Sequence, residues 1–337
     1  MAVSRPRLLL LIAVPAWLLC VTLYRSHRLC SGRVVFDASG ALPSYAYLLF
    51  RSRIRALRKK RGRLYPSTEG VPETGFAVVN CRIDTDHLRQ YCSAAGYGWD
   101  YPDSAFRDIP LLYPAVLCSR LFATIVSSAG FRLSPLGLLC LQQTVRKLQP
   151  VDELKKGPFQ LQASVSEYRP VSAGVEVDVS FKAVGDAGPV WESQITLLSP
   201  KTKHLQCHQD RLTQADGTDA GTRVEIRVSW STGLRWTWTL YGHFLKHLLW
   251  IQRPTAYGLW MQSQCLAEVE KHKGADAVRA PVSVHVLYRQ PLVLPGRASI
   301  RIWEDRNDAS FPAQKACRFQ MEDPKTRDLF ILGEVRS

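Results

Sequence analysis

The pattern of apolar and polar residues predicts a mixture of short strands and apolar helices. Residues 159–171, 174–185 and 189–199 alternate between the two classes and are separated by turn-forming residues, which predicts an antiparallel meander. Residues 135–149 are a further predicted strand. The segment 109–131 is instead almost continuously apolar, which predicts a long buried helix. Ahead of it, residues 74–83 form a predicted strand and 84–97 a helix, with Asp84 as N-cap and Gly96 as C-cap.

The C-terminal part of the chain repeats this order loosely. A predicted strand over 223–232 is followed by apolar helical stretches over 237–252 and 256–272, and then by strands within 281–305, 314–323 and 328–336. Each half therefore consists of a long apolar helix wrapped by a curved antiparallel sheet, which is an α+β arrangement. We place the two halves at 74–205 and 206–337.

The first residues predict a membrane anchor. Residues 8–24 are uncharged and apolar between Arg7 and Arg25, about the minimum length for a membrane-spanning helix. A cleaved signal peptide is the alternative, but arginines follow the run instead of a small-residue cleavage site. We therefore expect an uncleaved, single-pass anchor over 1–30 and a basic juxtamembrane linker over 31–73, in which residues 38–50 could form a short interfacial helix.

Charge is concentrated next to this anchor. The net charge is +15, and residues 51–63 contain eight Lys or Arg in thirteen positions. Such a run attracts anionic lipid or nucleic acid. The adjacent apolar segment favours lipid, and without a nucleic-acid motif we expect no nucleic acid as partner. Positive charge is heavier after the span, so the folded domain is expected in the cytosol, at the endoplasmic reticulum, with the mitochondrion as the alternative.

The cysteines agree with a reducing compartment. There are nine, an odd number, without a C-x-x-C pair, and most lie among apolar residues. This is typical of buried free thiols and not of a disulfide framework.

Four segments in order resemble the double hotdog form of the MaoC-like (R)-specific enoyl-CoA hydratase and acyl dehydratase family. They are residues 109–150, "PTAYGLWMQ" (254–262), "VLYRQPLVLPGRASI" (286–300) and "LFILGEVR" (329–336). The second resembles the family's Ala-His-Gly-Met-Trp signature, and the third its F-x-x-P-V-x-L-P strand pair. The resemblance covers roughly residues 75–335. It implies that an acyl-CoA binds between two hotdog halves, with its acyl chain in a tunnel of the N-terminal half.

The resemblance also implies where the chemistry should be, and there the sequence departs from the family. In the family an Asp and a His of an Asp-x-Asn-Pro-x-His motif, just after a Ser-Gly, act on a water. Alignment with "YGHFLKHLL" (241–249) matches Gly242 to the glycine, but puts His243 at the Asp and Leu248 at the His. A leucine cannot be a general base. His243 could hold a water, with His247 one helical turn away, but two imidazoles do not reproduce a carboxylate–imidazole pair.

The same alignment provides the candidate site residues. Tyr257 replaces the histidine of the family's Ala-His-Gly, Gly258 retains its glycine, and Cys140 stands at the histidine of its Gly-Leu-Val-His. The catalytic candidates are His243 and Tyr257. The substrate-binding candidates are Gly242, Gly258, Tyr113, Ala123 and Cys140.

Three functional hypotheses follow. The first is a membrane-anchored protein that binds acyl-CoA or a fatty acyl group without standard hydratase activity. The second is an active enoyl-CoA hydratase or 3-hydroxyacyl-CoA dehydratase, a lyase that uses substituted residues. The third is a protein-binding scaffold with a filled pocket. We expect no cofactor, and the oligomeric state is open, a homodimer included. No metal is expected either, because His204, Cys207 and His208 lack a second spaced ligand pair.

Overall fold

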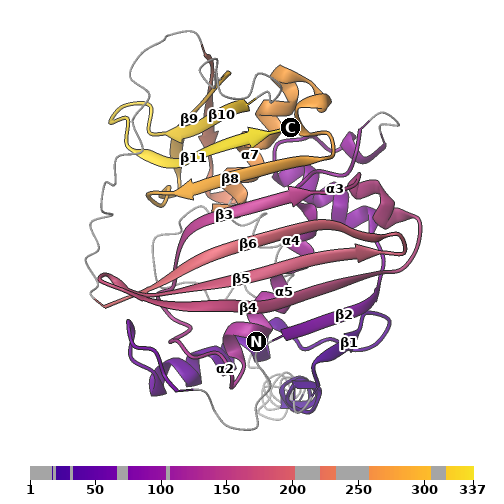
Figure 1. Cartoon of the computed structure of the whole chain (residues 1–337), viewed down its shortest axis with the longest axis vertical. Coiled ribbons are helices and arrows are strands. Elements are labelled where there is room, and N and C mark those ends of the chain that lie inside the picture. The colour runs from indigo at the N-terminus through magenta and orange to yellow at the C-terminus, as the bar shows by residue number, and fades with distance from the viewer. Residues whose placement is uncertain are drawn as a thin grey trace, which may run out of the picture.

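Eleven strands form one sheet that runs through both halves of the chain. The computed structural model describes residues 17, 20–30, 33–66, 75–103, 107–201, 221–232, 258–304 and 316–337. The strand order is β1-β2-β4-β5-β6-β3-β8-β11-β10-β9-β7, antiparallel except for β1 and β2 (Figure 1). The strands are β1 (Val35–Asp37), β2 (Gly75–Cys81), β3 (Leu139–Lys147), β4 (Phe159–Val171), β5 (Gly174–Gly185), β6 (Gly188–Pro200), β7 (Thr222–Val228), β8 (Val282–Tyr288), β9 (Gly296–Glu304), β10 (Ala316–Glu322) and β11 (Leu329–Arg336).

The two halves have the same topology. In the N-terminal half the sheet order is β2-β4-β5-β6-β3, and in the C-terminal half it is β7-β9-β10-β11-β8. Each half therefore places its first strand at one side, a three-strand meander in the middle, and its second strand at the other side. The second strands of both halves, β3 and β8, pair with each other, with Gln143 opposite Val286. This pair joins two repeats into one continuous sheet.

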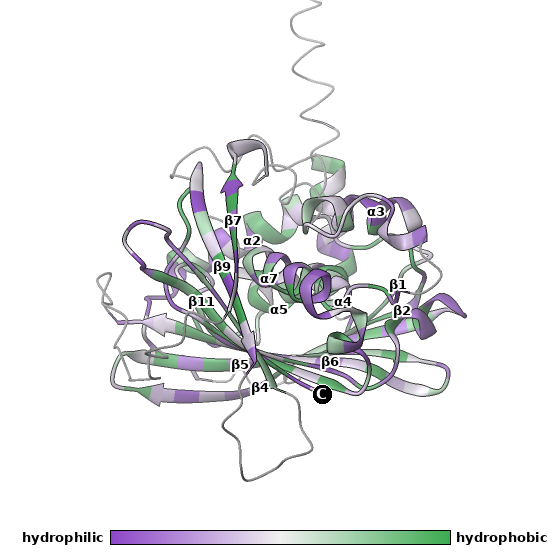
Figure 2. Cartoon of the chain, turned by 90° about the horizontal axis from the view of Figure 1, so that it is seen from above, coloured by the Kyte–Doolittle hydropathy of each residue, from purple (hydrophilic) through white to green (hydrophobic). Residues whose placement is uncertain are grey.

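The helices lie inside the curve of this sheet. α4 (Tyr113–Leu117), α5 (Ser119–Ser127) and α7 (Gly258–Lys273) are gathered on its concave side (Figure 2). α5 packs against β2 and β4, and α7 packs against β9, β10 and β11. Because the inward residues of alternating strands meet the apolar helix faces there, a single core forms between them. The described residues also form a helix over 20–30, α2 (Tyr45–Arg58), α3 (Thr85–Ala94) and the 3₁₀ turns Tyr101–Asp103, Val151–Lys155 and Ala275–Val278.

Helix α3 of the N-terminal half is hydrogen-bonded to α7 of the C-terminal half. Asp84 caps its first turn by accepting hydrogen bonds from the backbone N–H groups of Asp86 and His87, as the sequence predicts. At its other end Gly96 has φ +86°, the left-handed conformation expected just beyond a helix end. The carbonyl of Ala94 accepts a hydrogen bond of 3.0 Å from the Trp260 indole of α7. The end of α3 is thus fixed to the central helix of the other half.

Several sequence expectations need correction. The predicted long helix over 109–131 is two consecutive shorter helices, with Cys118 between them as the C-cap of α4 and the N-cap of α5. The segment 31–73, expected to be a linker, contains β1 and α2. The apolar helix expected over 38–50 is displaced, since α2 includes most of the basic run.

None of the helices among the described residues has both the length and the apolar character to cross a bilayer. Most of the segment 8–24 lies outside those residues.

Candidate functional site

The junction of the two halves encloses a small group of polar side chains. Tyr288 is the last residue of β8, and its hydroxyl lies 2.9 Å from the Oε1 atoms of both Gln143 and Gln262. Gln143 comes from β3 and Gln262 from α7, and both are almost completely buried. Gln143 also donates from Nε2 to the Ser193 hydroxyl of β6, at 3.0 Å. Strands of both halves and the central helix therefore meet at one tyrosine.

The side chains of Tyr288, Gln143 and Gln262 cannot satisfy all of their hydrogen-bonding atoms with one another. A tyrosine hydroxyl has a single hydrogen, so it can donate to only one of the two amide oxygens. The Nε2 atom of Gln262 is buried and has no hydrogen-bond partner among the described residues. Turning the Gln262 amide over would bring Nε2 to the hydroxyl and leave Oε1 free instead. In either orientation one polar atom of this side chain is left for another group to satisfy.

The Tyr288 phenol and the nearby thiols of Cys140 and Cys265 are neutral at physiological pH. Burial raises the pKa of Tyr288 well above its ordinary value, and the nearby thiols of Cys140 and Cys265 add to the shift. Burial also raises the pKa of Cys140 to about 12 and that of Cys265 well above the usual range. A phenol and two protonated thiols are poor bases and poor nucleophiles. The group can form hydrogen bonds but cannot remove a proton from water.

Gly258, where α7 begins, lies directly against this tyrosine. A Cβ atom added at Gly258 would lie 2.5 Å from Cε1 of Tyr288, closer than two carbon atoms can approach. The close contact requires glycine here. It also places the first turn of α7 beside the polar group.

A second polar group lies further along α7, at a cavity of about 340 Å³. Glu270 accepts a hydrogen bond of 2.7 Å from Tyr101, and burial raises the pKa of its carboxyl group. Lys147, which lines the same cavity and is almost fully buried, forms a 3.0 Å ion pair with Asp108. Asp108 also accepts from two backbone N–H groups, at Val151 and residue 152. Its contacts therefore indicate that Asp108 and Lys147 stabilise the fold at this place.

Comparison with known proteins identifies the fold. No family model and no curated protein matches this sequence. HtdX of Mycobacterium tuberculosis matches the structure with a TM-score of 0.57 at 15% sequence identity, over 77% of this chain and 98% of that one. A MaoC-like dehydratase from Phytophthora capsici matches with a TM-score of 0.57 at 16% identity, over 78% and 95% of the two chains. The chain has the MaoC-like hotdog fold. The double hotdog part of the fold class predicted from the sequence is confirmed, whereas the transmembrane helix predicted in front of it stays a prediction.

Within the MaoC-like hotdog fold, the predicted site residues separate into groups. Gly258 and Cys140 lie at the junction, beside Tyr288. Tyr113 is buried in α4, where its hydroxyl is 3.0 Å from Nδ1 of His87 and its ring centroid is 5.4 Å from that of Tyr91. Ala123 is half-buried on α5, the helix that packs against α2, β2 and β4.

Three other predicted residues, Gly242, His243 and Tyr257, lie outside the described residues, as does the stretch that resembles the catalytic motif. The zinc candidates His204, Cys207 and His208 lie outside them too. The described part of the chain contains no group of three or more His, Cys, Asp or Glu side chains able to hold a metal.

Sequence reasoning did not find Tyr288, Gln143 and Gln262. A weak signal existed for Gln143, which alternates with Val145 on the buried face of β3, but α7 is buried on nearly all sides around Gln262 and its sequence has no periodicity that singles this residue out. A polar residue at such a position needs partners. Which partners it has depends on the pairing of β3 with β8, and no local pattern specifies that pairing.

Proposed function

We propose that the protein binds an acyl-CoA or a related fatty acyl ligand at the junction of its two hotdog halves, without standard hydratase chemistry. The observation that supports this most directly is the unmatched amide of Gln262 beside Gly258 and Tyr288. A buried polar atom without a partner is costly, so it favours a ligand that supplies one. A thioester or hydroxyl oxygen has the required hydrogen-bonding capacity.

The proposed lack of hydratase activity rests on the chemistry of the groups. Hydration of an enoyl thioester needs a base to hold the water and an acid to protonate the α-carbon. Tyr288 and the neighbouring thiols are neutral, and His243 and Leu248 replace the Asp and His of the family motif. Neutral amides and phenols orient an oxygen atom, but they do not activate water. The ligand is therefore held and released unchanged.

Binding is tested by thermal unfolding of the full chain with acyl-CoAs of short and long chain. Saturation at a hundred times the dissociation constant would add about 2.7 kcal/mol to the free energy of unfolding. Gln262→Leu should abolish the ligand-dependent shift. Gln162→Leu, a half-buried glutamine of β4 in the N-terminal half, should preserve it. No shift with any chain length would remove the proposal and favour the scaffold hypothesis.

The acyl chain is proposed to follow the apolar helices of the N-terminal half. Ala123→Trp would add a large side chain to α5, and such overpacking can itself lower the free energy of unfolding by about 1–3 kcal/mol. The measurement must therefore compare unfolding with and without ligand. We expect the variant to lose the shift caused by long-chain acyl-CoA while it keeps a shift caused by short-chain acyl-CoA. Equal loss for both would argue against this path.

An active lyase is the second candidate, because structures of this fold include proteins described as dehydratases. Turnover of a trans-2-enoyl-CoA by the purified full chain separates the two candidates. We expect no rate above background. If turnover occurs, His243→Ala should abolish it. Activity that survives this substitution would show that the reacting groups lie elsewhere.

We also propose that residues 8–24 anchor the chain in a membrane with the folded part in the cytosol. The support is the apolar run in the sequence and the excess of positive charge after it. The cysteines in the described part of the chain are free, which agrees with a reducing compartment. Protease added to intact microsomes should digest the folded domain. Full protection would refute this topology.

A further inference from the structure

Helix α2 has a second apolar face that points away from the protein. Its inward face, with Tyr45, Leu48 and Ser52, is buried. On the opposite side Phe50 is 53% exposed, Ile54 38% and Leu57 88%. Their spacing of four and three residues places these side chains in one row along the helix. Large apolar side chains in a continuous exposed row mark a surface that contacts another apolar phase.

Positive charge borders this row on both sides. At 100° per residue, Arg53 falls on one side of the row, and Arg51 and Arg58 fall on the other. There is no Asp or Glu anywhere from residue 38 to residue 66. None of the described ion pairs involves a cation of the run 51–63. The positive charges therefore lack a counter-charge within the described part of the protein.

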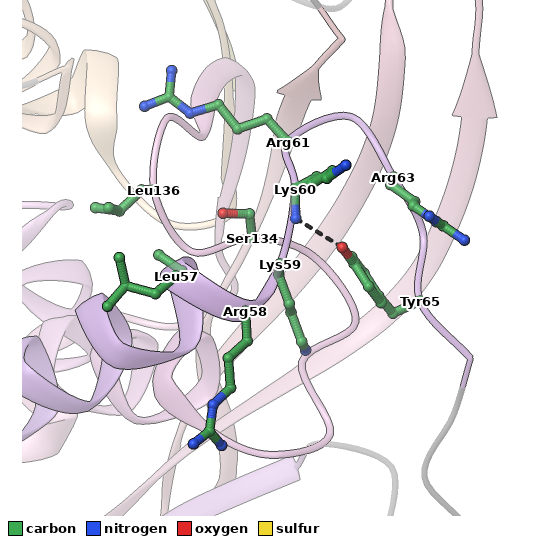
Figure 3. A pocket seen from close by; sticks show the side chains of 10 residues that line it. Leu57, Arg58, Lys59, Lys60, Arg61, Arg63, Tyr65, Ser134 and Leu136 are labelled. Atoms are coloured by element: carbon green, nitrogen blue, oxygen red, sulfur yellow. Dashed lines mark hydrogen bonds between the residues drawn. The ribbon is translucent and has the colours of Figure 1, made fainter.

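The end of α2 leads into a hollow of about 530 Å³. Figure 3 shows basic side chains around it, together with exposed leucines at one side. The lining residues are Ala56, Leu57, Arg58, Lys59, Lys60, Arg61, Arg63, Tyr65, Ser134 and Leu136. Cations and hydroxyl groups can bind a phosphate, and the apolar residues at the rim can contact a hydrocarbon chain attached to it.

The hollow is held in shape by hydrogen bonds that leave most of its charges free. The Tyr65 hydroxyl accepts a hydrogen bond of 2.7 Å from the backbone N–H of Lys60 (Figure 3). The backbone N–H of Gly62 donates to Ser199 at 3.0 Å, where φ of +68° lets the chain turn. Lys59 is half-buried and donates to a backbone carbonyl, that of Phe131, and not to a carboxylate. The loop is thus fixed by neutral partners.

The N-terminal segment is fastened beside the same helix. Residues 20–30 are helical, and the Ser26 hydroxyl donates to that of Ser44, the N-cap of α2, at 3.1 Å. Nδ1 of His27 lies 2.9 Å from the Tyr47 hydroxyl. The end of the apolar run is thereby held close to the start of α2. Tyr24, within that run, is 64% exposed.

We propose that the outer face of α2 and the adjoining hollow form a docking surface for an anionic phospholipid bilayer. Phe50, Ile54 and Leu57 enter the hydrocarbon boundary, and the cations of the hollow bind phosphate-bearing headgroups. An in-plane amphipathic helix with basic borders has this mode of membrane contact. Because Leu136 lines the hollow just before β3, docking brings the start of that strand, which leads to Cys140, close to the bilayer. This surface is separate from the junction and does not depend on its ligand.

Hydrogen–deuterium exchange of the full chain tests the proposal. The chain is mixed with nanodiscs of phosphatidylcholine alone, or with roughly one third phosphatidylserine. We expect several-fold slower exchange in peptides spanning 50–63 with the anionic nanodiscs only. Raising the salt to about 1 M, where screening acts over about 3 Å, should reverse most of this protection. Equal exchange with both nanodiscs would overturn the proposal.

Charge and apolar variants separate the two parts of the surface. The triple change Arg58→Glu, Arg61→Glu and Arg63→Glu should remove the protection. A triple Glu variant of the exposed residues Arg82, Arg227 and Arg279 should keep it.

Leu57→Asp should weaken the protection, whereas Val293→Asp, which also changes an exposed apolar residue, should not. If inorganic phosphate with neutral nanodiscs protects residues 50–63 equally, the hollow is a soluble-anion site and the bilayer assignment fails. Thermal unfolding with acyl-CoA reports on the junction, so failure of either proposal can be recognised by itself.

Discussion

Removing the hydroxyl of Tyr288 should destabilise the fold by an amount that depends on Gln262. With the Gln262 amide turned so that Nε2 donates to the Tyr288 hydroxyl and the hydroxyl donates to Gln143, Tyr288→Phe removes one hydrogen bond from each of the two buried glutamines. An unsatisfied buried polar group costs about 1–3 kcal/mol. Gln143 keeps its bond to Ser193, so we expect a total loss of about 2 kcal/mol in the free energy of unfolding.

Gln262→Leu should behave differently. The change removes an amide that already has one unmatched atom, and replaces it with an apolar group of similar size. The free energy of unfolding should therefore change by less than about 1 kcal/mol. In the double variant, Tyr288→Phe leaves only Gln143 without its partner. The two changes should deviate from additivity by about 1 kcal/mol, in the direction of a smaller loss.

Urea denaturation of the full-length variants measures this cycle. The matched control combines Tyr168→Phe with Gln162→Leu, both in β4. These residues are six positions apart, roughly 20 Å along a strand, so their effects should add. Additive effects at Tyr288 and Gln262 would refute the reasoning, because they would mean that the hydroxyl and the amide do not share a hydrogen bond.

Three further outcomes are expected. Gly258→Ala should lower the free energy of unfolding by about 1–3 kcal/mol, because the new methyl group would lie 2.5 Å from Tyr288. A Cβ atom added at Gly40 would have its nearest neighbouring atom 3.5 Å away, so Gly40→Ala should change the free energy of unfolding by less than about 0.5 kcal/mol. Equal urea midpoints for the two variants would contradict the predicted difference between them. Burial raises the pKa of Glu270, so its contribution to stability is present below the unfolded-state pKa and is lost as pH rises through the folded-state pKa. Glu270→Gln should flatten that part of the curve of stability against pH, and an unchanged curve would show that another group titrates. Asp84→Ala should cost about 1 kcal/mol through loss of the α3 N-cap, measured by thermal unfolding, and an unchanged midpoint would contradict it.

The elements predicted best are those with strong local signals. The strands expected over 159–171 and 174–185 have these bounds in the structure, because strict alternation is interrupted there by turn-forming residues. The helix after Asp84 begins where its capping side chain indicates. These features depend on residues close to each other in sequence, and a strand or cap requires little else to form.

The apolar segments were predicted less well. A continuously apolar segment indicates burial, but it has no periodic pattern of apolar and polar positions. It therefore does not indicate where a helix is interrupted. The expected helix is divided at Cys118 into α4 and α5. Likewise, the basic run lies largely in α2, because Tyr45 and Leu48 find a partner surface on α5 that the sequence does not reveal.

The sequence by itself predicted the two-fold repeat of helix and strands, the resemblance to MaoC-like proteins and, from the alignment of residues 241–249, the replacement of the acid–base pair, which stays a prediction. All three are properties of residue order. Only the tertiary structure decided that Tyr288, Gln143 and Gln262 share hydrogen bonds, since they come from β8, β3 and α7 and meet only when the two halves pair. It also decided that the second apolar face of α2 is exposed. A helix with two apolar faces can bury either one, and packing against α5 selects which face is left for another partner.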